Sequence, residues 1–266
     1  MTTWTDYHVH TQFSCDSDVP METMCRAALT RGIAEIAFTD HADFEPLDVC
    51  SGYFRPERYW EAIRRCRDLF DGQLTIRAGV ECGEGHIYGA KIAALLATGD
   101  YDVVLGSIHW AQGRSVFDEH LFDGLTLDEG LTLYFDELAG LTTQADYDVI
   151  AHFDIIRRAT HLRFGMQELD LTRHEQQVRA ILRTVARRGK GIEINTSYRR
   201  KGIGEPGPSV QILRWFREEG GRIVTLGSDS HAPDHLAGDF ERGLAMLREA
   251  GFERPTTFER RQPHGG

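Results

Sequence analysis

Seven short apolar runs alternate along the chain with longer stretches of helical period, and this alternation constrains the fold more than any other feature. The runs are Asp6–Val9, Glu35–Thr39, Thr75–Val80, Val103–Ile108, Val149–Ala151, Gly191–Ile194 and Ile223–Gly227. Alternating strand and helix patterns are typical of βαβ units, whose strands run parallel in an α/β fold. Seven such units in series favour a closed, TIM-like β/α barrel, and an open doubly wound sheet is the alternative that periodicity leaves.

Five of the intervening stretches carry clear helix signals. Pro20 precedes the first of them and Gly32 follows it, which suits the start and the end of a helix. The predicted helices are Met21–Arg31, Pro56–Phe70, Thr172–Arg188, Val210–Glu219 and Phe240–Ala250. Because no Ser-, Pro- or Gly-rich linker divides the chain, we predict one barrel domain over residues 1–250 and a loosely held polar tail over 251–266.

The balance of charges narrows the range of partners. The chain has 30 Lys and Arg residues against 41 Asp and Glu residues, which gives a formal net charge of −11. A chain of this charge repels nucleic acid backbones, so we do not expect a nucleic acid polymer as its main partner. A small substrate held through bound cations is compatible with the charge, and the oligomeric state stays open.

The five cysteines are odd in number and form no C-x-x-C pair. This usage predicts no disulfide framework and fits a reducing cytoplasm. Residues 1–20 lack the pattern of a signal peptide, and no apolar run has the length needed to cross a bilayer. We therefore expect a cytoplasmic protein that does not engage a membrane.

Histidines and carboxylates gather where the apolar runs end. Six of the 12 histidines lie at the ends of the runs, whereas about one would lie there by chance. These residues, with two carboxylates at the same ends, are His8, His10, His41, Glu81, His109, His152, Asp229 and His231. Since the C-terminal ends of barrel strands open onto one face, we expect these side chains to converge.

The spacing within two of these groups suits metal binding. His8 and His10 are two residues apart, as are Asp229 and His231, and side chains at this spacing leave a strand on the same side. Imidazole nitrogens combined with carboxylate oxygens form a ligand set for zinc, iron or manganese rather than for calcium. The sequence therefore predicts a metal centre at the mouth of the barrel.

The same segments resemble the polymerase-and-histidinol-phosphatase (PHP) superfamily. The matching stretches begin near the N-terminus and extend to about residue 235: Asp6–Thr11, Ala37–His41, Ala78–Glu81, Leu105–His109, Ile150–Asp154 and Leu226–His231. Within the superfamily the chain is most similar to the stand-alone histidinol-phosphate phosphatases. Glu193–Ser197 and Glu205–Ser209 are further points of likeness to that group.

This resemblance implies a distorted (β/α)7 barrel that holds three divalent metal ions, which are zinc, iron or manganese. The implied ligands of the first ion are His8, His10, Glu81 and Asp229. Those of the second are Glu81, His109 and His152, and those of the third are Asp16, His41 and His231. Asp16 follows the first run within a loop, so periodicity alone does not single it out.

The implied activity is hydrolysis of a phosphate monoester, in the first place L-histidinol phosphate to L-histidinol and phosphate in histidine biosynthesis. Three divalent ions and three carboxylates leave the site positive, which suits a phosphate dianion, and we hypothesise in-line attack by a metal-bridging hydroxide. Catalytic roles are expected for Asp229 and His231. Contacts to phosphate are expected from Arg200 and from Arg157 or Arg158. The acid that protonates the leaving alcohol is identified no further than a histidine or aspartate of the metal rim.

Two positions depart from the pattern of the histidinol-phosphate phosphatases. Tyr198 stands where a small residue usually follows Asn-Thr-Ser, and Gly207 replaces an aromatic residue between two prolines. We expect both positions to line the pocket for the leaving group. Asp43 and Glu45 are candidates to meet the ammonium group of histidinol.

Three other functions stay open at this point. The substrate could be a nucleotide or another small phosphate ester. An amidohydrolase that cleaves C–N bonds also begins its barrel with H-x-H, but it often has a metal-bridging lysine on the fourth strand, where this chain has His109. A non-catalytic metal-binding domain is the third alternative, against which the complete set of ligands argues.

Overall fold

A computed structural model describes residues 4–265 and shows a nearly closed barrel of seven parallel strands. The strands follow one another in the order β1-β2-β4-β5-β8-β9-β10. Their bounds are Trp4–Val9, Ile33–Phe38, Thr75–Gly83, Val103–Ser107, Val149–Ile150, Gly191–Asn195 and Val224–Gly227. The ring closes through a parallel bridge between Val9 and Ser230, where the backbone N–H of His10 donates to the Ser230 carbonyl at 2.9 Å. The predicted barrel is confirmed.

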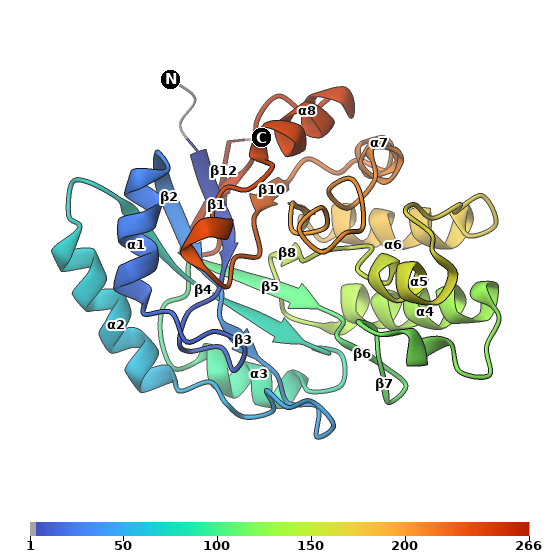
Figure 1. The fold of residues 1–266 in the computed structure, drawn as a ribbon, viewed down its shortest axis with the longest axis horizontal. Helices are drawn as coiled ribbons and strands as arrows, with labels where there is room; N and C mark the ends of the chain where they lie inside the picture. The colour runs from blue at the N-terminus through green and yellow to red at the C-terminus, as the bar shows by residue number, and fades with distance from the viewer. Residues whose placement is uncertain (1–3, 266) are drawn as a thin grey trace.

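Within residues 4–265, eight α-helices surround the strands, with α1 and α2 on one side of the view and α4, α5 and α6 on the other (Figure 1). They are α1 Met21–Thr30, α2 Pro56–Leu69, α3 Gly89–Leu96, α4 Leu127–Gln144, α5 Arg157–Phe164, α6 Glu175–Arg187, α7 Val210–Glu218 and α8 Phe240–Glu249. The seven predicted strands and five predicted helices agree with these bounds to within three residues. Across residues 4–265, no helix is both long and apolar enough to cross a membrane.

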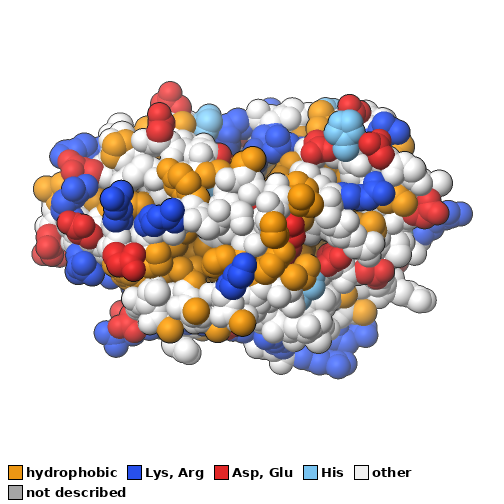
Figure 2. Space-filling view, turned by 90° about the horizontal axis from the view of Figure 1, so that it is seen from below, with side chains coloured by type: hydrophobic (Ala, Val, Ile, Leu, Met, Phe, Trp, Pro, Cys, Tyr) orange, Lys and Arg blue, Asp and Glu red, His pale blue; other side chains and the backbone are white. Residues whose placement is uncertain are grey.

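Short strands extend the barrel at its C-terminal mouth. β3, His41–Ala42, continues β2 after two residues and pairs with β4 in the same register, so that His41 lies beside Glu81. β6, Trp110–Ala111, and β7, Arg114–Ser115, form a separate hairpin. The loop after β3 exposes Leu47, Val49 and Tyr53. Hydrophobic side chains spread across the middle of the face seen in Figure 2, which views the molecule from below.

Alternation along the strands separates the inside of the barrel from its outside. Ala37, Val103 and Leu105 pack with Tyr7 and Phe258 in one cluster. Their strand neighbours, such as Ile36, Phe38 and Val104, pack instead with residues of the helices. Because successive side chains point to opposite faces of a sheet, the first cluster fills the barrel interior.

The C-terminal segment differs from the loosely held tail that its polar composition predicted. It forms a hairpin of β11, Thr257–Glu259, and β12, Gln262–His264. Phe258 is buried, and its backbone N–H donates to the Tyr7 hydroxyl at 2.7 Å. Arg261 forms ion pairs with Asp146 and Asp148 at 2.6 and 2.8 Å. The buried ring of Phe258, its backbone hydrogen bond and the ion pairs of Arg261 together hold this segment against the barrel.

The cysteines also differ from the prediction, because Cys15 and Cys50 form a disulfide across 35 residues. The first lies in the loop after β1 and the second in the loop after β3, and the fold brings their Cα atoms to 5.2 Å. The remaining cysteines, Cys25, Cys66 and Cys82, are free and buried. An odd count of cysteines carries no information about such a contact between two loops.

Candidate metal centre

All nine side chains that were expected to be metal ligands, eight from the strand ends and Asp16 from the family resemblance, meet at the mouth of the barrel. They come from β1 and its following loop, from β3 and β4, and from the residues directly after β5, β8 and β10. Seven of them line one cavity of about 250 Å³: Asp16, His41, Glu81, His109, His152, Asp229 and His231. His8 and His10 are fully buried beside these residues.

Glu81 lies at the centre of the cluster and is fully buried. Its Oε1 lies 2.8 Å from His152 Nε2 and 3.3 Å from His109 Nε2. Its Oε2 lies 3.0 Å from His41 Nδ1 and 3.2 Å from His8 Nε2. One carboxylate therefore contacts imidazoles from four different segments of the chain, which is the arrangement expected of a group that bridges cations.

Two further carboxylates complete the set. Asp229 Oδ1 lies 3.4 Å from His10 Nε2 and 3.6 Å from His231 Nδ1. Asp16 is half exposed, and its Oδ2 lies 2.9 Å from His231 Nε2 and 3.7 Å from His41 Nε2. Asp16, which only the family resemblance indicated, thus lies with the histidines at the outer edge of the cluster.

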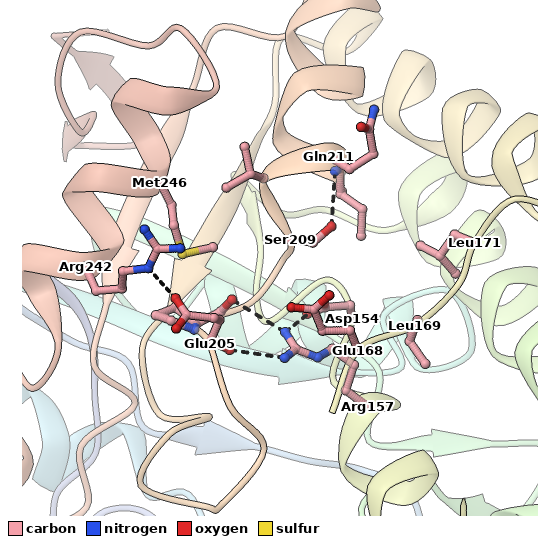
Figure 3. A pocket seen from close by; sticks show the side chains of 13 residues that line it. Asp154, Arg157, Glu168, Leu169, Leu171, Glu205, Ser209, Gln211, Arg242 and Met246 are labelled. Atoms are coloured by element: carbon pink, nitrogen blue, oxygen red, sulfur yellow. Dashed lines mark hydrogen bonds and ion pairs between the residues drawn. The ribbon is translucent and has the colours of Figure 1, made fainter. Parts of the chain in front are cut away.

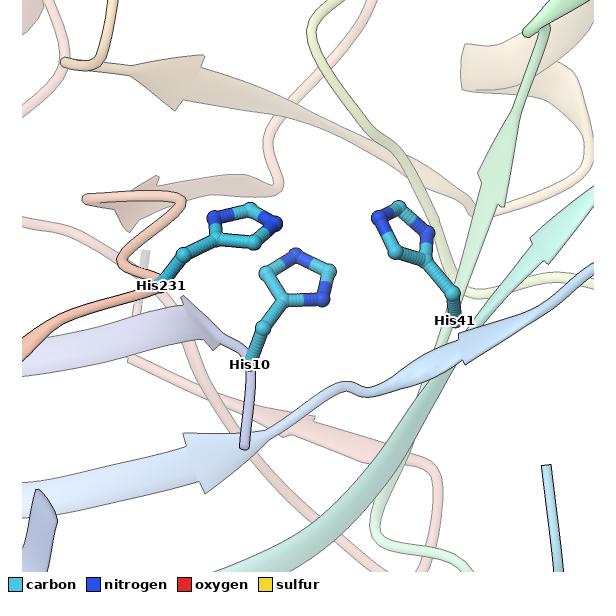
Figure 4. Close-up of side chains that lie close together, drawn as sticks. All are labelled: His10, His41 and His231. Carbon is cyan, nitrogen blue, oxygen red and sulfur yellow. The ribbon is translucent and has the colours of Figure 1, made fainter. Parts of the chain in front are cut away.

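The possible ligand atoms fall into overlapping groups of three, with all atoms of a group within 4.8 Å of one another. The groups are His8, His10 and Asp229; His8, Glu81 and His152; His41, Glu81 and His109; and His10, His41 and His231. The last three rings face a common space in Figure 4, with centroids of His10 and His231 4.1 Å apart. Overlap of this kind suits a multinuclear centre rather than one isolated ion.

The hydrogen bonding of the rings tests whether a metal fits. Among the described side chains, His10 Nε2, His41 Nδ1 and His231 Nε2 are buried ring nitrogens without a hydrogen-bond partner. His41 Nδ1 lies only 3.0 Å from a carboxylate oxygen and still makes no hydrogen bond. Buried nitrogens that face oxygens without bonding them leave their lone pairs free, as metal coordination requires. The donor set fits divalent cations.

Charge within the cluster shifts the pKa values of its members. Burial alone would lower the pKa of His8, His41 and His109, but neighbouring carboxylates outweigh it and raise each pKa well above its usual value. For His10, burial and the neighbouring His231 and His41 hold the pKa well below its usual range. Burial would raise the pKa of Glu81, but the surrounding imidazoles hold it well below its ordinary value.

Two supporting side chains, Glu193 and Ser14, were not singled out as candidate site residues by the sequence. Glu193 Oε1 lies 2.7 Å from His8 Nδ1, and its Oε2 accepts a hydrogen bond from the backbone N–H of His152 at 2.7 Å. Ser14 Oγ lies 3.0 Å from His10 Nδ1 and donates to Asp40 at 2.8 Å. Such contacts orient metal-binding rings. Two of these residues follow predicted patterns, since Glu193 lies on a predicted strand and Asp40 directly follows one.

The backbone at the mouth is also adapted to the site. His152 and Asp229 have positive φ angles of 28° and 51°, in a region that costs energy for residues other than glycine. At Gly227, an added Cβ would collide with the Glu193 carboxylate and the side chain of His8. Glycine at this position therefore permits the contact between these two residues.

The two neighbouring arginines after β8, Arg157 and Arg158, line different cavities. Arg158 lines the cavity of the metal cluster, with its guanidinium 5.4 Å from the centre of the Phe117 ring. Arg157 is buried and lines a separate cavity of about 290 Å³, where Figure 3 shows it near Asp154 and Glu205. Of the two arginines from which one phosphate contact was expected, Arg158 is therefore the one beside the metal cluster, whereas Arg157 lines a different cavity.

The basic group after β9 is divided in a similar way. Lys201, rather than Arg200, lines the cavity, and its Nζ lies 3.1 Å from Asp229 Oδ2. Arg200 donates from one guanidinium nitrogen to the carbonyls of Ser228 and Asp229 at 3.0 and 2.9 Å. It therefore holds the backbone that carries one of the candidate ligands.

Tyr198 and Gly207, the two departures from the family pattern, lie against each other. Tyr198 is fully buried, and its hydroxyl donates to Asp154 at 2.8 Å. A Cβ at position 207 would lie 2.6 Å from Cζ of this ring. The larger residue at one position therefore fills the space left by the smaller one at the other. Neither residue lines the cavity, so the prediction that both line the leaving-group pocket is wrong.

The two acidic candidates for an ammonium contact are both engaged elsewhere. Asp43 Oδ1 lies 3.0 Å from His109 Nδ1, so this carboxylate orients a candidate metal ligand. Glu45 accepts a hydrogen bond from the Tyr88 hydroxyl at 2.8 Å and does not line the cavity. A Cβ at Gly83 would collide with the Asp43 carboxylate, so the glycine makes room for it.

Comparison with known proteins gives consistent matches. The family model of the PHP domain matches residues 6–197. A histidinol-phosphatase of Lactococcus lactis subsp. lactis is 26% identical over 265 residues, covering 95% of this chain and 93% of the relative. A probable histidinol-phosphatase of Clostridium acetobutylicum is 28% identical over 258 residues, covering 96% and 97%.

A solved structure supports the same fold. The histidinol phosphate phosphatase of L. lactis, complexed with zinc, L-histidinol and phosphate, aligns with a TM-score of 0.87 at 23% identity. The alignment covers 98% of each chain. The agreement over the full length shows that the barrel described above is shared between the two proteins.

Proposed function

The chain belongs to the PHP domain family, and from this premise we propose that it is a metal-dependent phosphatase that hydrolyses L-histidinol phosphate to L-histidinol and phosphate. The observation that carries the proposal is the meeting of six imidazoles and three carboxylates at the mouth of the barrel, beside or in a cavity that Arg158 and Lys201 also line. The two relatives named as histidinol-phosphatases, which match nearly the full chain, support the choice of substrate.

The proposed cofactors are three divalent ions held by the nine ligands given above, with zinc as the first candidate and iron or manganese as alternatives. The zinc in the L. lactis structure supports the first choice. The overlapping groups of ligand atoms support more than one ion. A cytoplasmic location stays a prediction, and the disulfide between Cys15 and Cys50 removes one of the arguments for it.

Bound divalent cations supply a water of lowered pKa and neutralise the charge on phosphoryl oxygens. The chain's own residues then orient the substrate. The guanidinium of Arg158 and the ammonium of Lys201 lie in the same cavity and are suited to donate to phosphate oxygens. Asp229 and His231 are the proposed catalytic residues of the rim. A direct contact of Arg200 with phosphate stays a prediction beside its contact with the backbone of Asp229.

Phosphate release by the purified full-length chain tests this function. The chain is loaded separately with zinc, manganese or ferrous iron, and L-histidinol phosphate is compared with adenosine monophosphate and p-nitrophenyl phosphate. We expect kcat/KM for L-histidinol phosphate to exceed the other values by about 100-fold, because polar groups of a specific site reject substrates that leave them unpaired. Solvent oxygen-18 is expected in the released phosphate, and metal analysis is expected to find about three ions per chain.

The other functions predict different results. Preference for adenosine monophosphate would assign the chain to another phosphate ester. A protein that binds metal but releases phosphate from none of the esters would be a non-catalytic metal-binding domain or an enzyme for C–N bonds. Against that last alternative, β5, the fourth strand of the barrel, is followed by His109 and not by a bridging lysine.

A further inference from the structure

Five carboxylates line the cavity of the metal cluster, and four of them are already engaged. Asp16, Glu81 and Asp229 contact the imidazoles of the cluster. Asp43 bonds the ring of His109. The fifth, Asp48, lies in the loop after β3 and has no hydrogen bond to a candidate metal ligand.

Asp48 is held in place without being neutralised. Its Oδ1 accepts a hydrogen bond from the backbone N–H of Cys50, and its Oδ2 accepts one from the indole N–H of Trp110, both at 2.7 Å. Within residues 4–265, no lysine, arginine or histidine forms an ion pair with this carboxylate. A carboxylate can accept about four hydrogen bonds, so this one keeps capacity for a cationic group.

The surroundings of Asp48 indicate what kind of cation fits. A carboxylate oxygen of Asp48 and one of Asp43 lie within 4.8 Å of each other and of Cys50 Sγ. An ammonium nitrogen bonded to Asp48 would therefore also lie near the negative charge of Asp43, whose carboxylate is already bonded to His109. The sulfur of Cys50 is bonded to Cys15, so it is no thiolate ligand for a transition metal. Val49, Phe117 and Ile155 also line the cavity and offer apolar contacts to the imidazole ring of the proposed substrate.

We propose that Asp48 receives the ammonium group of the substrate and thereby selects phosphate esters of amino alcohols over esters that lack an amine. The inference rests on the phosphatase function proposed above. Arg158 and Lys201 supply positive charge for the phosphate in the same cavity, whereas Asp48 supplies negative charge for the amine. The cavity therefore distinguishes the two ends of a zwitterionic substrate.

The test compares two substrates and two variants of the metal-loaded full-length chain. L-Histidinol phosphate is paired with 3-(imidazol-4-yl)propyl phosphate, which lacks only the amine. Asp48→Asn removes the charge and nearly preserves the shape. The matched control, Glu45→Gln, removes a charge from the same loop outside the cavity. Metal content and circular dichroism are measured for both variants.

We expect Asp48→Asn to lower kcat/KM for L-histidinol phosphate by about 10- to 100-fold, mainly through KM, because a charge-assisted hydrogen bond is lost. Activity on the amine-free ester is expected to stay within about twofold, as are both activities of Glu45→Gln. The metal content of Asp48→Asn should equal that of the unmodified chain.

Three results would overturn the inference while leaving the phosphatase function intact. They are an equal loss on both esters, no loss on the amine-bearing ester, or the loss of a metal ion from Asp48→Asn. An unmodified chain that hydrolyses both esters equally well would also contradict it. If the unmodified chain releases phosphate from neither ester, the proposed function itself fails, and the role of Asp48 fails with it.

Discussion

Glu81 and Glu193 contact the two nitrogens of one imidazole, that of His8. Glu193 lies 2.7 Å from Nδ1, and Glu81 lies 3.2 Å from Nε2. A proton on Nδ1 that is donated to Glu193 leaves the lone pair of Nε2 directed toward the cluster. Glu193 thus orients a candidate ligand without belonging to the set of nine.

The variants Glu193→Gln and Glu81→Gln compare the proposed orienting role of Glu193 with the proposed ligand role of Glu81. Loss of an orienting carboxylate is expected to weaken metal binding by about 10- to 100-fold, whereas loss of the shared ligand is expected to remove at least one ion. Competition with a chelator measures the affinity, and elemental analysis counts the ions. Equal metal affinities of Glu193→Gln and the unmodified chain would exclude the orienting role.

At the level of elements, the loop between β9 and α7 owes its position to a residue on α5. Arg157 donates to the carbonyls of Gln167, Ile203 and Glu205 at 2.9, 3.0 and 3.2 Å. Its guanidinium also lies 4.8 Å from the centre of the Tyr198 ring. Lys201, which lines the cavity, lies in this loop, so a side chain outside the cavity helps to fix the position of a basic residue inside it.

We therefore expect Arg157→Met to affect mainly the stability of the protein and Arg158→Met to affect mainly the binding of substrate. The first removes the donor of three hydrogen bonds, one of them to the carbonyl of the buried Ile203, and is expected to lower the free energy of unfolding by roughly 3 kcal/mol. The second removes a cation from the cavity and is expected to raise KM about tenfold or more with little change in stability. Urea unfolding and steady-state kinetics measure the two effects. A stable Arg157→Met protein with a raised KM would show instead that Arg157 contacts the substrate.

The C-terminal hairpin is a second element whose contacts can be tested. Phe258 packs in the barrel interior near the N-terminal ends of the strands, away from the mouth. Phe258→Ala is expected to lower the free energy of unfolding by about 3–5 kcal/mol, the usual effect of emptying a buried aromatic site. Phe164→Ala, a control at a half-exposed phenylalanine, should have an effect of about 1 kcal/mol or less.

A measurement of catalytic activity tests whether the C-terminal hairpin affects stability alone or also affects the metal centre. Because the hairpin lies at the other end of the barrel, the kcat of Phe258→Ala at 25 °C is expected to stay within about twofold of the unmodified value. Thermal unfolding followed by circular dichroism gives the stability. A stability loss of less than about 1 kcal/mol would mean that the tail is held loosely after all.

For the whole molecule, the stability of the fold depends on the protonation of the histidines in the cluster and on the binding of metal ions to them. In the metal-free chain, His8, His41 and His109 have pKa values well above the ordinary value of 6.5, so each adds stability that is fully present below that value. This stability is lost as the pH rises through the raised pKa values. His10, with its lowered pKa, has the opposite effect, but it is one ring against three.

The metal-free chain is therefore expected to lose unfolding free energy as the pH rises above about 6.5. Cations replace the same protons, so the zinc-loaded chain is expected to gain stability over this range. Melting temperatures of the chelator-treated and zinc-loaded proteins between about pH 6 and pH 9 measure both trends. Parallel pH profiles of the two forms would contradict the exchange of protons for metal.

The local pattern of the sequence determined most of the scaffold. Each strand of the barrel is a short apolar run, and the histidines at the strand ends are visible as H-x-H and similar spacings. Both features depend on residues within a few positions of one another, since alternation and strand ends are local properties. The parallel topology then brings the strand ends to one face, so the meeting of these histidines followed from the fold class.

Only the tertiary structure decided which of two neighbouring residues faces the cavity and which faces away. Arg157 and Arg158 are adjacent and alike in the sequence, but the turn into α5 directs them to different cavities. The disulfide of Cys15 with Cys50, the complementary pair of Tyr198 and Gly207, and the docking of Phe258 are likewise contacts between distant segments. Their energies arise when side chains that no short-range pattern relates are packed against each other, and composition and periodicity contain no record of them.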